Sequence, residues 1–565
     1  MLKKPFLLLL IFLFQSCTMN KLLNQESTSG QTVDPITSWY QKDLTADSIP
    51  GISLDKWYGE CKIKKAKNEI IVAVLDSQID LDHEDLTGQF WINKNEIANN
   101  GIDDDNNGYI DDINGWNFVG KKNGESLEWS NHEFIRVIRK FQNEFKSKEE
   151  IDIPAEKLDN YLEYQNAIST LKSKLKYYED WQNSIIFLKD IYFTSKDSIK
   201  KYFPTEKYTI KQLDSLYKLK KINEKSFLQR KEDKDYDVGA LIDYMIISKE
   251  MNLEYDNLVL QETLFDSIIN KSLNLSFNDR FEIGDNEGIL EKGYGNNNVN
   301  TSSSNSSKNH STSVSSLIIA NRKNKIGIQG FSSNIKIMPI CISPKGEKHD
   351  KDIAMAIYYA VDNGAKIINM SFSKEEFSVN KEWVFDAINY AEARNVLIVS
   401  SAGNNAHDID KIKKFPNDLD YVTKREISDN FINVGASTNN FNAKLISNSS
   451  NFGKLSVDLF APGSRISVAI KENKYEYADG TSYAAPMVSG TAALIWLYYP
   501  QLTVQEVKNI ILESGVTIDQ KVIKPGTQDE MVPFSELCKS GKILNTYNAM
   551  KMAEEVSKKK KQKMK

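Results

Sequence analysis

The chain has 565 residues, a formal net charge of −5 and 4 cysteines. Its length exceeds that of one ordinary domain and predicts a domain of catalytic size with an additional region. The near-balanced charge argues against nucleic-acid binding, and so few cysteines exclude a disulfide-built scaffold. Hydrophobic residues make up 40% of the chain, so a sizeable core can form.

Residues 1–17 have the pattern of a signal peptide. Lys3 and Lys4 precede the apolar run Phe6–Phe14, and Cys17 follows shortly after it. The segment resembles a bacterial lipoprotein signal, which implies that Cys17 is lipidated. A lipidated Cys17 would anchor the exported protein to a cell-envelope membrane, on the periplasmic or surface side. A plain signal peptide with an incidental cysteine is the alternative.

The second half of the chain predicts an α/β fold. Strands and helices alternate from residue 310 to about residue 550, which indicates a parallel sheet covered by helices on both faces. Glu69–Leu75 is rich in β-branched residues, as is typical of a buried parallel strand. Further strands are expected at Lys336–Ile342, Lys366–Met370, Val396–Ser400 and Phe431–Val434, and helices at Asp352–Asn363, Asn380–Arg394, Ser482–Tyr499 and Val504–Ser514.

Residues 121–295 differ from the rest in being nearly free of glycine over most of their length. Apolar side chains recur there at steps of three and four residues, which is a helical period. Examples are Phe134, Ile138, Phe141 and Phe145, and later Tyr161, Tyr164, Ile168, Leu171, Leu175 and Tyr178. At the other end of the chain, residues 551–565 form a basic tail that we expect to be solvated, with contact to an anionic surface as the alternative.

Gly480–Pro486 is the most informative stretch for function. Glycine before Ser482 allows close approach of a substrate backbone, and the helix expected there would present Ser482 together with unpaired backbone N–H groups. An N-capping serine on a core helix is the alternative. The stretch Gly-Thr-Ser-Tyr-Ala-Ala-Pro resembles the serine segment of subtilisin-like serine proteases (subtilases, peptidase family S8). The resemblance implies a three-layer subtilisin-like fold and Ser482 as the nucleophile.

The resemblance extends to the other members of a catalytic triad, which subtilases carry in the order Asp, His, Ser. Val72–Leu86 is similar to the family's aspartate segment and places Asp76 at the catalytic position. His310–Asn321 is similar to the histidine helix, although serines replace its glycines and its second histidine. By this resemblance Asp76 orients the imidazole and His310 is the general base.

Two further segments match the family. Val396–Asn404 is a strand that ends in Ala-Gly-Asn, and the resemblance implies that the Asn404 side chain donates to the oxyanion; a surface-turn asparagine is the alternative. Ile367–Ser373 resembles the edge segment that pairs with the substrate backbone, which makes Ser371, Phe372 and Ser373 the expected substrate-binding residues. An ordinary core strand is the alternative for this segment.

Gly101–Asp112 predicts a calcium loop. Oxygen-bearing side chains stand at alternate positions from Asp103 and a glycine turn follows, as in the first half of an EF-hand loop. Position twelve, counted from Asp103, is Asn114 instead of the glutamate of an EF-hand. Two interpretations are therefore possible: a shorter calcium site that Asp111 or Asp112 closes, or a polar turn that binds no metal. Calcium would be structural, and no cofactor is expected in catalysis. The candidate ligands are Asp103, Asp105, Asn107, Tyr109 and Asp112.

These inferences combine into a lipid-anchored serine endopeptidase that acts on polypeptides through an acyl-enzyme and does not bind nucleic acid. A catalytically silent peptide-binding scaffold and a narrow-specificity processing protease are the alternatives. Residues 121–295 would be a helical insertion in the peptidase domain, either a decoration or a lid or docking arm. The expected parts are the signal peptide 1–17, a tether and N-terminal segment 18–65, the peptidase domain 66–120 and 296–550, the insertion 121–295, and the tail 551–565.

Overall fold

The computed structural model describes residues 38–60, 68–300 and 309–563. The predicted signal peptide and Cys17 lie outside these residues. The described chain forms two compact units. One unit holds residues 38–128 and 279–563, and the other holds residues 129–278.

The larger unit is built on one mixed but mostly parallel sheet, so the predicted α/β fold is confirmed. Strand β1 (Ile70–Asp76) lies inside it and pairs in parallel with β3 (Ile335–Cys341) and β4 (Ile367–Met370). Among the described residues the nine strands follow the order β14-β17-β11-β10-β6-β4-β1-β3-β2, and only β14 runs antiparallel to its neighbour. The remaining bounds are β2 Trp116–Asn117, β6 Leu397–Ser401, β10 Phe431–Ser437, β11 Leu459–Pro462, β14 Val516–Thr517 and β17 Lys542–Ile543.

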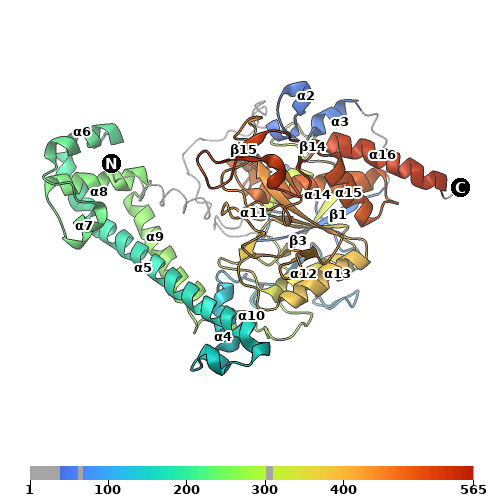
Figure 1. Ribbon diagram of the computed structural model, residues 1–565, viewed down its shortest axis with the longest axis horizontal. Coiled ribbons are helices and arrows are strands. Elements are labelled where there is room, and N and C mark those ends of the chain that lie inside the picture. Colours follow the sequence, from blue (N-terminus) through green and yellow to red (C-terminus); the bar gives the residue numbers. More distant parts are fainter. Residues whose placement is uncertain (1–37, 61–67, 301–308, 564–565) are drawn as a thin grey trace. The chain divides into compact units, whose positions relative to one another are not determined.

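Alternate side chains of β1 enter two different hydrophobic clusters, because successive strand residues point to opposite faces. Val72 and Val74 belong to a cluster with residues of α11, α14, α15 and α16, whereas Ala73 and Leu75 belong to a cluster with residues of α12 and α13. The sheet is therefore the middle of three layers, with α12 and α13 on the face opposite to α14 (Figure 1). These helices are α11 His310–Ile319, α12 Asp350–Asp362, α13 Lys381–Ala393, α14 Thr481–Tyr498, α15 Val504–Ser514 and α16 Thr546–Lys563.

Shorter elements complete this unit. The predicted strands and helices of residues 310–550 all form, with ends within three residues of those expected. The basic tail continues α16, and most of its described lysines are exposed. The short helices are η1 Trp39–Gln41, α2 Leu44–Asp47, α3 Leu54–Glu60, α10 Arg280–Ile283 and η6 Phe534–Glu536; the two-stranded pairs are β5 Lys374–Glu375 with β7 Lys414–Phe415, β8 Leu419–Asp420 with β9 Arg425–Glu426, β12 Ile466–Ile470 with β13 Lys474–Ala478, and β15 Lys521–Ile523 with β16 Met531–Pro533.

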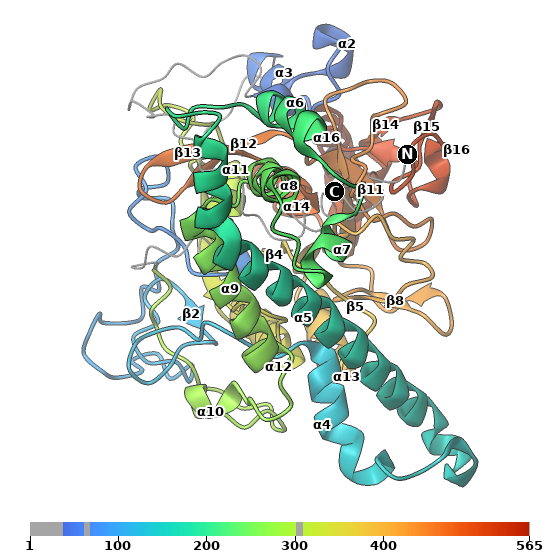
Figure 2. The same ribbon diagram turned by 90° about the vertical axis from the view of Figure 1, so that its left-hand side faces the viewer.

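The smaller unit is helical, as the apolar period of the sequence predicts. Its longest element, α5 (Leu158–Lys200), packs against α4 (Glu133–Phe145), α8 (Val238–Glu250) and α9 (Tyr255–Ser267) (Figure 2). Ile185, Leu188 and Ile191 of α5 contribute to its core. The other elements are η2 Glu150–Asp152, η3 Ala155–Lys157, α6 Ile210–Lys220, α7 Phe227–Glu232 and a π-helical turn at Ile268–Ser272. No helix within residues 38–60, 68–300 and 309–563 is both long and apolar enough to cross a membrane.

Candidate active site

Asp76 and His310 meet at the carboxyl end of the parallel sheet. Asp76 is the last residue of β1 and is 3% exposed, and His310 is the first residue of α11. The Nδ1 atom of His310 lies 2.7 Å from Oδ2 of Asp76, although 234 positions separate the two residues. The backbone N–H of Ser77 donates to the other oxygen of the Asp76 carboxylate at 2.7 Å. Because Nδ1 faces the carboxylate, Nε2 is the ring nitrogen left to exchange a proton.

The helix that starts at His310 accommodates the serines of this chain. Ser311 is fully buried, and its backbone N–H donates to Oγ of Ser77 at 3.4 Å. Ser313 donates its hydroxyl to the carbonyl of Asn309 at 3.0 Å, which is a local bond within the first helical turn. The Asp76–His310 contact thus forms with serines at these positions. The Ser313 hydroxyl has a local partner, whereas the buried Ser311 hydroxyl has none among the described residues.

Ser482 lies in the first turn of α14, as its segment predicts. The residue before the helix, Gly480, has φ of 143°, a conformation that favours glycine. The ring of Tyr483 packs 6.0 Å from the ring of His310, measured between centroids, so the start of α14 adjoins the imidazole. Within the described chain, the hydrogen bond found for the Ser482 hydroxyl goes to the carbonyl of Ser371 at 3.0 Å, and not to His310. Hydrogen bonds between catalytic groups are commonly long or unformed without substrate.

Pro486 links the start of this helix to the neighbouring segment. A proline has no N–H, so the carbonyl of Ser482, four residues earlier, lacks its usual helical partner. The hydroxyl of Ser371 donates to that carbonyl at 2.8 Å. Ser371 thus both accepts from the side chain of Ser482 and donates to its backbone, and it fixes the predicted substrate-binding segment against the helix that carries Ser482.

Asn404 follows β6 and is oriented by the start of α14. Its Oδ1 atom accepts from the backbone N–H of Thr481 at 2.9 Å and from the Thr481 hydroxyl at 3.0 Å. Because a backbone N–H can only donate, Oδ1 must be the atom that faces Thr481, and the Nδ2 group faces away from it. A Cβ atom placed on Gly480 would lie 3.2 Å from this Nδ2. The amide donor therefore sits beside the residues that immediately precede Ser482.

Phe372 and Ser373 continue the segment of Ser371 after β4. The Nζ atom of Lys348 lies 5.3 Å from the centroid of the Phe372 ring, a cation–π geometry. Burial lowers the pKa of Lys348, partly offset by the nearby Asp76 carboxylate. The structure thus brings Asp76, His310, Ser482, Asn404 and the segment 371–373 to one end of the sheet.

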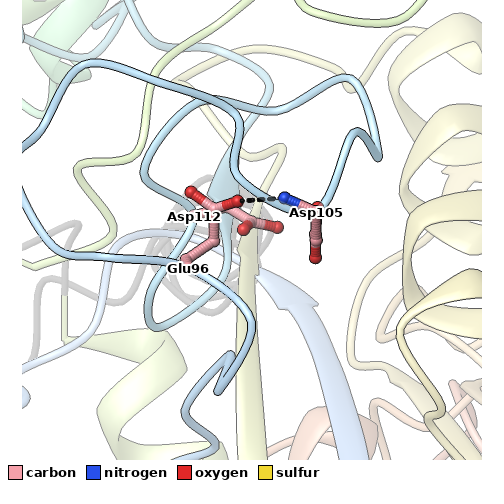
Figure 3. Close-up of side chains that lie close together, drawn as sticks. All are labelled: Glu96, Asp105 and Asp112. Carbon is pink, nitrogen blue, oxygen red and sulfur yellow. Dashed lines mark hydrogen bonds between the residues drawn. The ribbon is translucent and has the colours of Figure 1, made fainter.

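Asp105 and Asp112 of the predicted calcium loop form a cluster with Glu96, which precedes the loop (Figure 3). One carboxylate oxygen from each of the three residues lies within 4.8 Å of the other two. Burial raises the pKa of Asp112 to about 6, although hydrogen bonds from Tyr359 and Asn93 oppose this shift. The Tyr359 hydroxyl donates to Asp112 at 2.6 Å.

The other predicted ligands, Asp103, Asn107 and Tyr109, are not members of this carboxylate cluster. Asp103 accepts from the backbone N–H groups of Asn107 at 3.0 Å and of Gly108 at 2.8 Å, so its carboxylate stabilises the turn. The Asn107 side chain donates to Asp112 at 3.1 Å, and Tyr109 is buried. Glu96 is absent from the sequence-based set because it precedes the repeating motif, and no spacing signal points to it.

The sequence model described as Peptidase_S8, subtilase family, matches residues 67–533. The chain is 33% identical over 244 residues to a thermophilic serine proteinase of Bacillus sp. (strain AK1), and the match covers 43% of this chain and 52% of that protein. It is 29% identical over 221 residues to a cell wall-associated protease of Bacillus subtilis (strain 168), with coverage of 39% and 22%.

Among solved structures, the prenylagaramide maturation protease PagA is 26% identical, with a TM-score of 0.35 and coverage of 43% of this chain and 82% of that one. The chain spans about half, or less, of the length of the two curated relatives named above. The family match covers most of the chain and includes every residue of the predicted triad. The chain therefore belongs to the subtilase family.

Proposed function

We propose that the protein is a serine endopeptidase that cleaves polypeptides through an acyl-enzyme. The observation that carries the proposal is the 2.7 Å contact between His310 and Asp76 beside the start of the Ser482 helix. In the proposed reaction Ser482 Oγ attacks the peptide carbonyl while its proton passes to Nε2 of His310. His310 then gives this proton to the leaving amine, and water hydrolyses the acyl-enzyme by the same steps.

The remaining residues have supporting roles in this proposal. Asp76 holds the imidazole in the tautomer with a free Nε2 and stabilises the imidazolium. Asn404 Nδ2 and the backbone N–H of Ser482 donate to the oxyanion. An extended substrate would pair with the segment Ser371–Ser373, where main-chain hydrogen bonds supply affinity. Covalent labelling of the native protein by a fluorophosphonate tests the proposal; a silent scaffold would leave Ser482 unlabelled.

Asn404→Ala should lower kcat by about 10²–10³-fold with little change in KM, because the lost donor acts on charge that develops only in the transition state. Steady-state kinetics on a fluorogenic peptide measures both constants. Asn440→Ala is a suitable control, since Asn440 is exposed and bonds locally to Thr438. A loss that appears in KM alone would contradict the oxyanion role.

We also propose that the acidic loop binds a structural calcium ion through Glu96, Asp105 and Asp112. Oxygens that surround one Ca²⁺ at 2.3–2.6 Å can lie up to about 5 Å apart, and the three carboxylates satisfy this limit. Their close approach and partial burial would otherwise place like charges together at a cost. No step of the proposed reaction uses this ion.

Calcium in large excess over its dissociation constant should raise Tm by about 2–4 °C relative to EGTA. The folded-state pKa of Asp112, about 6, lies above its ordinary value of 3.8. Without metal, Asp112 therefore costs stability as pH rises from about 4 to 6, and calcium must displace its proton below pH 6. The Tm gain should be larger at pH 7.5 than at pH 5.

Asp112→Asn should remove most of this Tm gain. Asp104→Asn is the matched control, because the Asp104 side chain lies in the same loop but accepts from Ile97 and Asn100, outside the carboxylate cluster. Scanning calorimetry in calcium and in EGTA measures both variants. Equal responses of the wild type and D112N would refute the site.

Two proposals concern the parts outside the sheet unit. The basic residues and the apolar run at the start of the sequence support export and lipid anchoring at Cys17. The other proposed partners are the polypeptide substrates. In the chain, residues 129–278 lie between the two stretches that form the sheet unit, which supports their description as an insertion. A decoration, a lid and a docking arm are all compatible with such an insertion.

A further inference from the structure

Glu375 joins the predicted substrate-binding segment to the segment that carries Asn404. It is the second residue of β5, two positions after Ser373. Its Oε2 atom accepts from Nδ1 of His407 and from Nδ2 of Asn405, both at 2.9 Å. Its Oε1 atom accepts from Nδ2 of Asn451 at 3.1 Å. The side chain is 16% exposed, so this carboxylate is largely buried but reached by solvent.

Asn451 connects the Glu375 carboxylate to the backbone around Asn404 by hydrogen bonds. Its Nδ2 also donates to the carbonyl of Ala402 at 3.0 Å, and its Oδ1 accepts from the backbone N–H groups of Asn405 at 3.0 Å and His407 at 2.8 Å. Its own N–H donates to the carbonyl of Gly403 at 2.9 Å. The position of Glu375 is therefore set by the same loop that positions the oxyanion donor.

Gly403 marks where this loop touches the substrate-binding segment. A Cβ atom at residue 403 would lie 2.5 Å from Nδ2 of Asn451 and 2.9 Å from Oγ of Ser373. Its φ of 103° also favours glycine. The two segments thus approach each other closely between Asn404 and Glu375, and a substrate that lies along Ser373 comes next to both.

Glu375 carries a negative charge that its neighbouring lysines do not neutralise. Burial raises the pKa of Glu375, but hydrogen bonds from His407 and Asn405 outweigh it, so the carboxyl is ionised at neutral pH. The Nζ atom of Lys374 bonds to Asp350 at 2.5 Å. Lys414, opposite Glu375 in the β5–β7 pair, directs its buried amine to Ser400 at 2.7 Å, and burial lowers its pKa to about 7.

His407 is the cationic partner found for Glu375 among the described residues, and it is charged only when protonated. The hydrogen bond to Glu375 raises the pKa of His407, while burial opposes that rise. Well above the ordinary imidazole pKa, the pair therefore carries a net negative charge.

We propose that Glu375 selects a basic side chain, arginine or lysine, on the residue whose carbonyl Ser482 attacks. The inference rests on the proposed function, because it requires that carbonyl to lie between Ser482 and Asn404. Asn405, which follows Asn404, donates directly to Glu375 at 2.9 Å, so the carboxylate contacts the residue next to the proposed oxyanion donor. In this proposal a long substrate side chain, attached beside the carbonyl, lies against this carboxylate. A guanidinium or ammonium group there gains a charge-assisted hydrogen bond in a poorly hydrated position.

Paired fluorogenic peptides with arginine or citrulline at this position test the proposal at pH 9. Citrulline keeps the shape of arginine and lacks its charge, so the ratio of the two kcat/KM values isolates the charge. The wild type should prefer arginine by about 10-fold or more, the effect of one hydrogen bond between charged groups. Glu375→Gln should bring the ratio to about 1–3. Glu376→Gln is the matched control, since Glu376 is the adjacent, exposed acid, and it should keep the wild-type ratio.

The outcomes separate the possible failures. A purely structural Glu375 would slow both peptides equally and leave the ratio unchanged in E375Q, which overturns the inference. If E375Q does not fold, the arginine-to-citrulline ratio of the wild type still tests the inference. Glu375→Asp, which keeps the charge, should then retain the arginine preference. Cleavage with a wild-type ratio near 1 overturns this inference alone. A wild type that neither cleaves nor reacts with a fluorophosphonate overturns the proposed function as well.

Discussion

Ser482→Ala should abolish fluorophosphonate labelling and lower kcat by about 10⁶-fold, the size of loss known for the nucleophile of a subtilisin. The variant keeps the peptide segment and the oxyanion donors but has no oxygen to form the acyl-enzyme. Residual activity of about 10³–10⁴ over water can remain, because Asn404 and substrate binding still act. Intact-mass measurement after labelling and steady-state kinetics on a peptide provide the two readouts.

The folded state of S482A should differ little from the wild type. The Ser482 hydroxyl makes one described hydrogen bond, to the Ser371 carbonyl, and a bond of this kind contributes about 1 kcal/mol. Ser464→Ala is the control, because its hydroxyl bonds to Asp479 in the loop that leads toward the nucleophile. S464A should label normally. Labelling that persists in S482A would place the reactive serine elsewhere.

Asp76→Asn should lower kcat by about 10⁴-fold while the fold is retained. In the wild type the carboxylate accepts from Nδ1 of His310 at 2.7 Å and leaves Nε2 free to take the serine proton. An asparagine amide can donate to Nδ1 instead, which favours the tautomer with hydrogen on Nε2 and removes the base. The kcat/KM of the variant, followed from pH 6 to pH 10, measures this loss.

Asp82→Asn is the companion variant for this experiment. Asp82 lies in the same segment and is exposed, and its carboxylate accepts a long 3.4 Å hydrogen bond from Asn300. We expect the kcat/KM of D82N to stay within about threefold of the wild-type value, because surface substitutions generally have small effects. A D76N activity within tenfold of the wild type would show that His310 is not oriented by Asp76.

The strands and helices of the sheet unit could be predicted because their sequence patterns are local. The β-branched run that ends at Asp76 forms β1, and the apolar small-residue stretch after Ser482 forms α14. The position of His310 followed from its order in the chain and from the family resemblance, and its contact with Asp76 agrees with that placement.

Other features of the site depend on contacts that spacing does not reveal. Glu96 joins the carboxylate cluster from a loop without periodic pattern. The hydrogen bond from the Ser482 hydroxyl to the Ser371 carbonyl depends on the rotamer of Ser482. The bond from the Ser371 hydroxyl depends on the Ser482 carbonyl that Pro486 leaves without a helical donor. The environment of Glu375 could not be predicted from the sequence, because Asn405, His407 and Asn451 come to it only in the folded chain.

The pairing of β1 also constrains how the protein is made. Ile70 pairs with Ile335 in the central sheet, so β1 has no neighbour until about 265 more residues (335 − 70) have been synthesised. At about 5–20 residues per second this interval lasts roughly 15–50 s, and non-local pairing of this kind is slow. Asp76, His310, Asn404 and Ser482 come together only after that closure. An unfinished chain therefore lacks the assembled site.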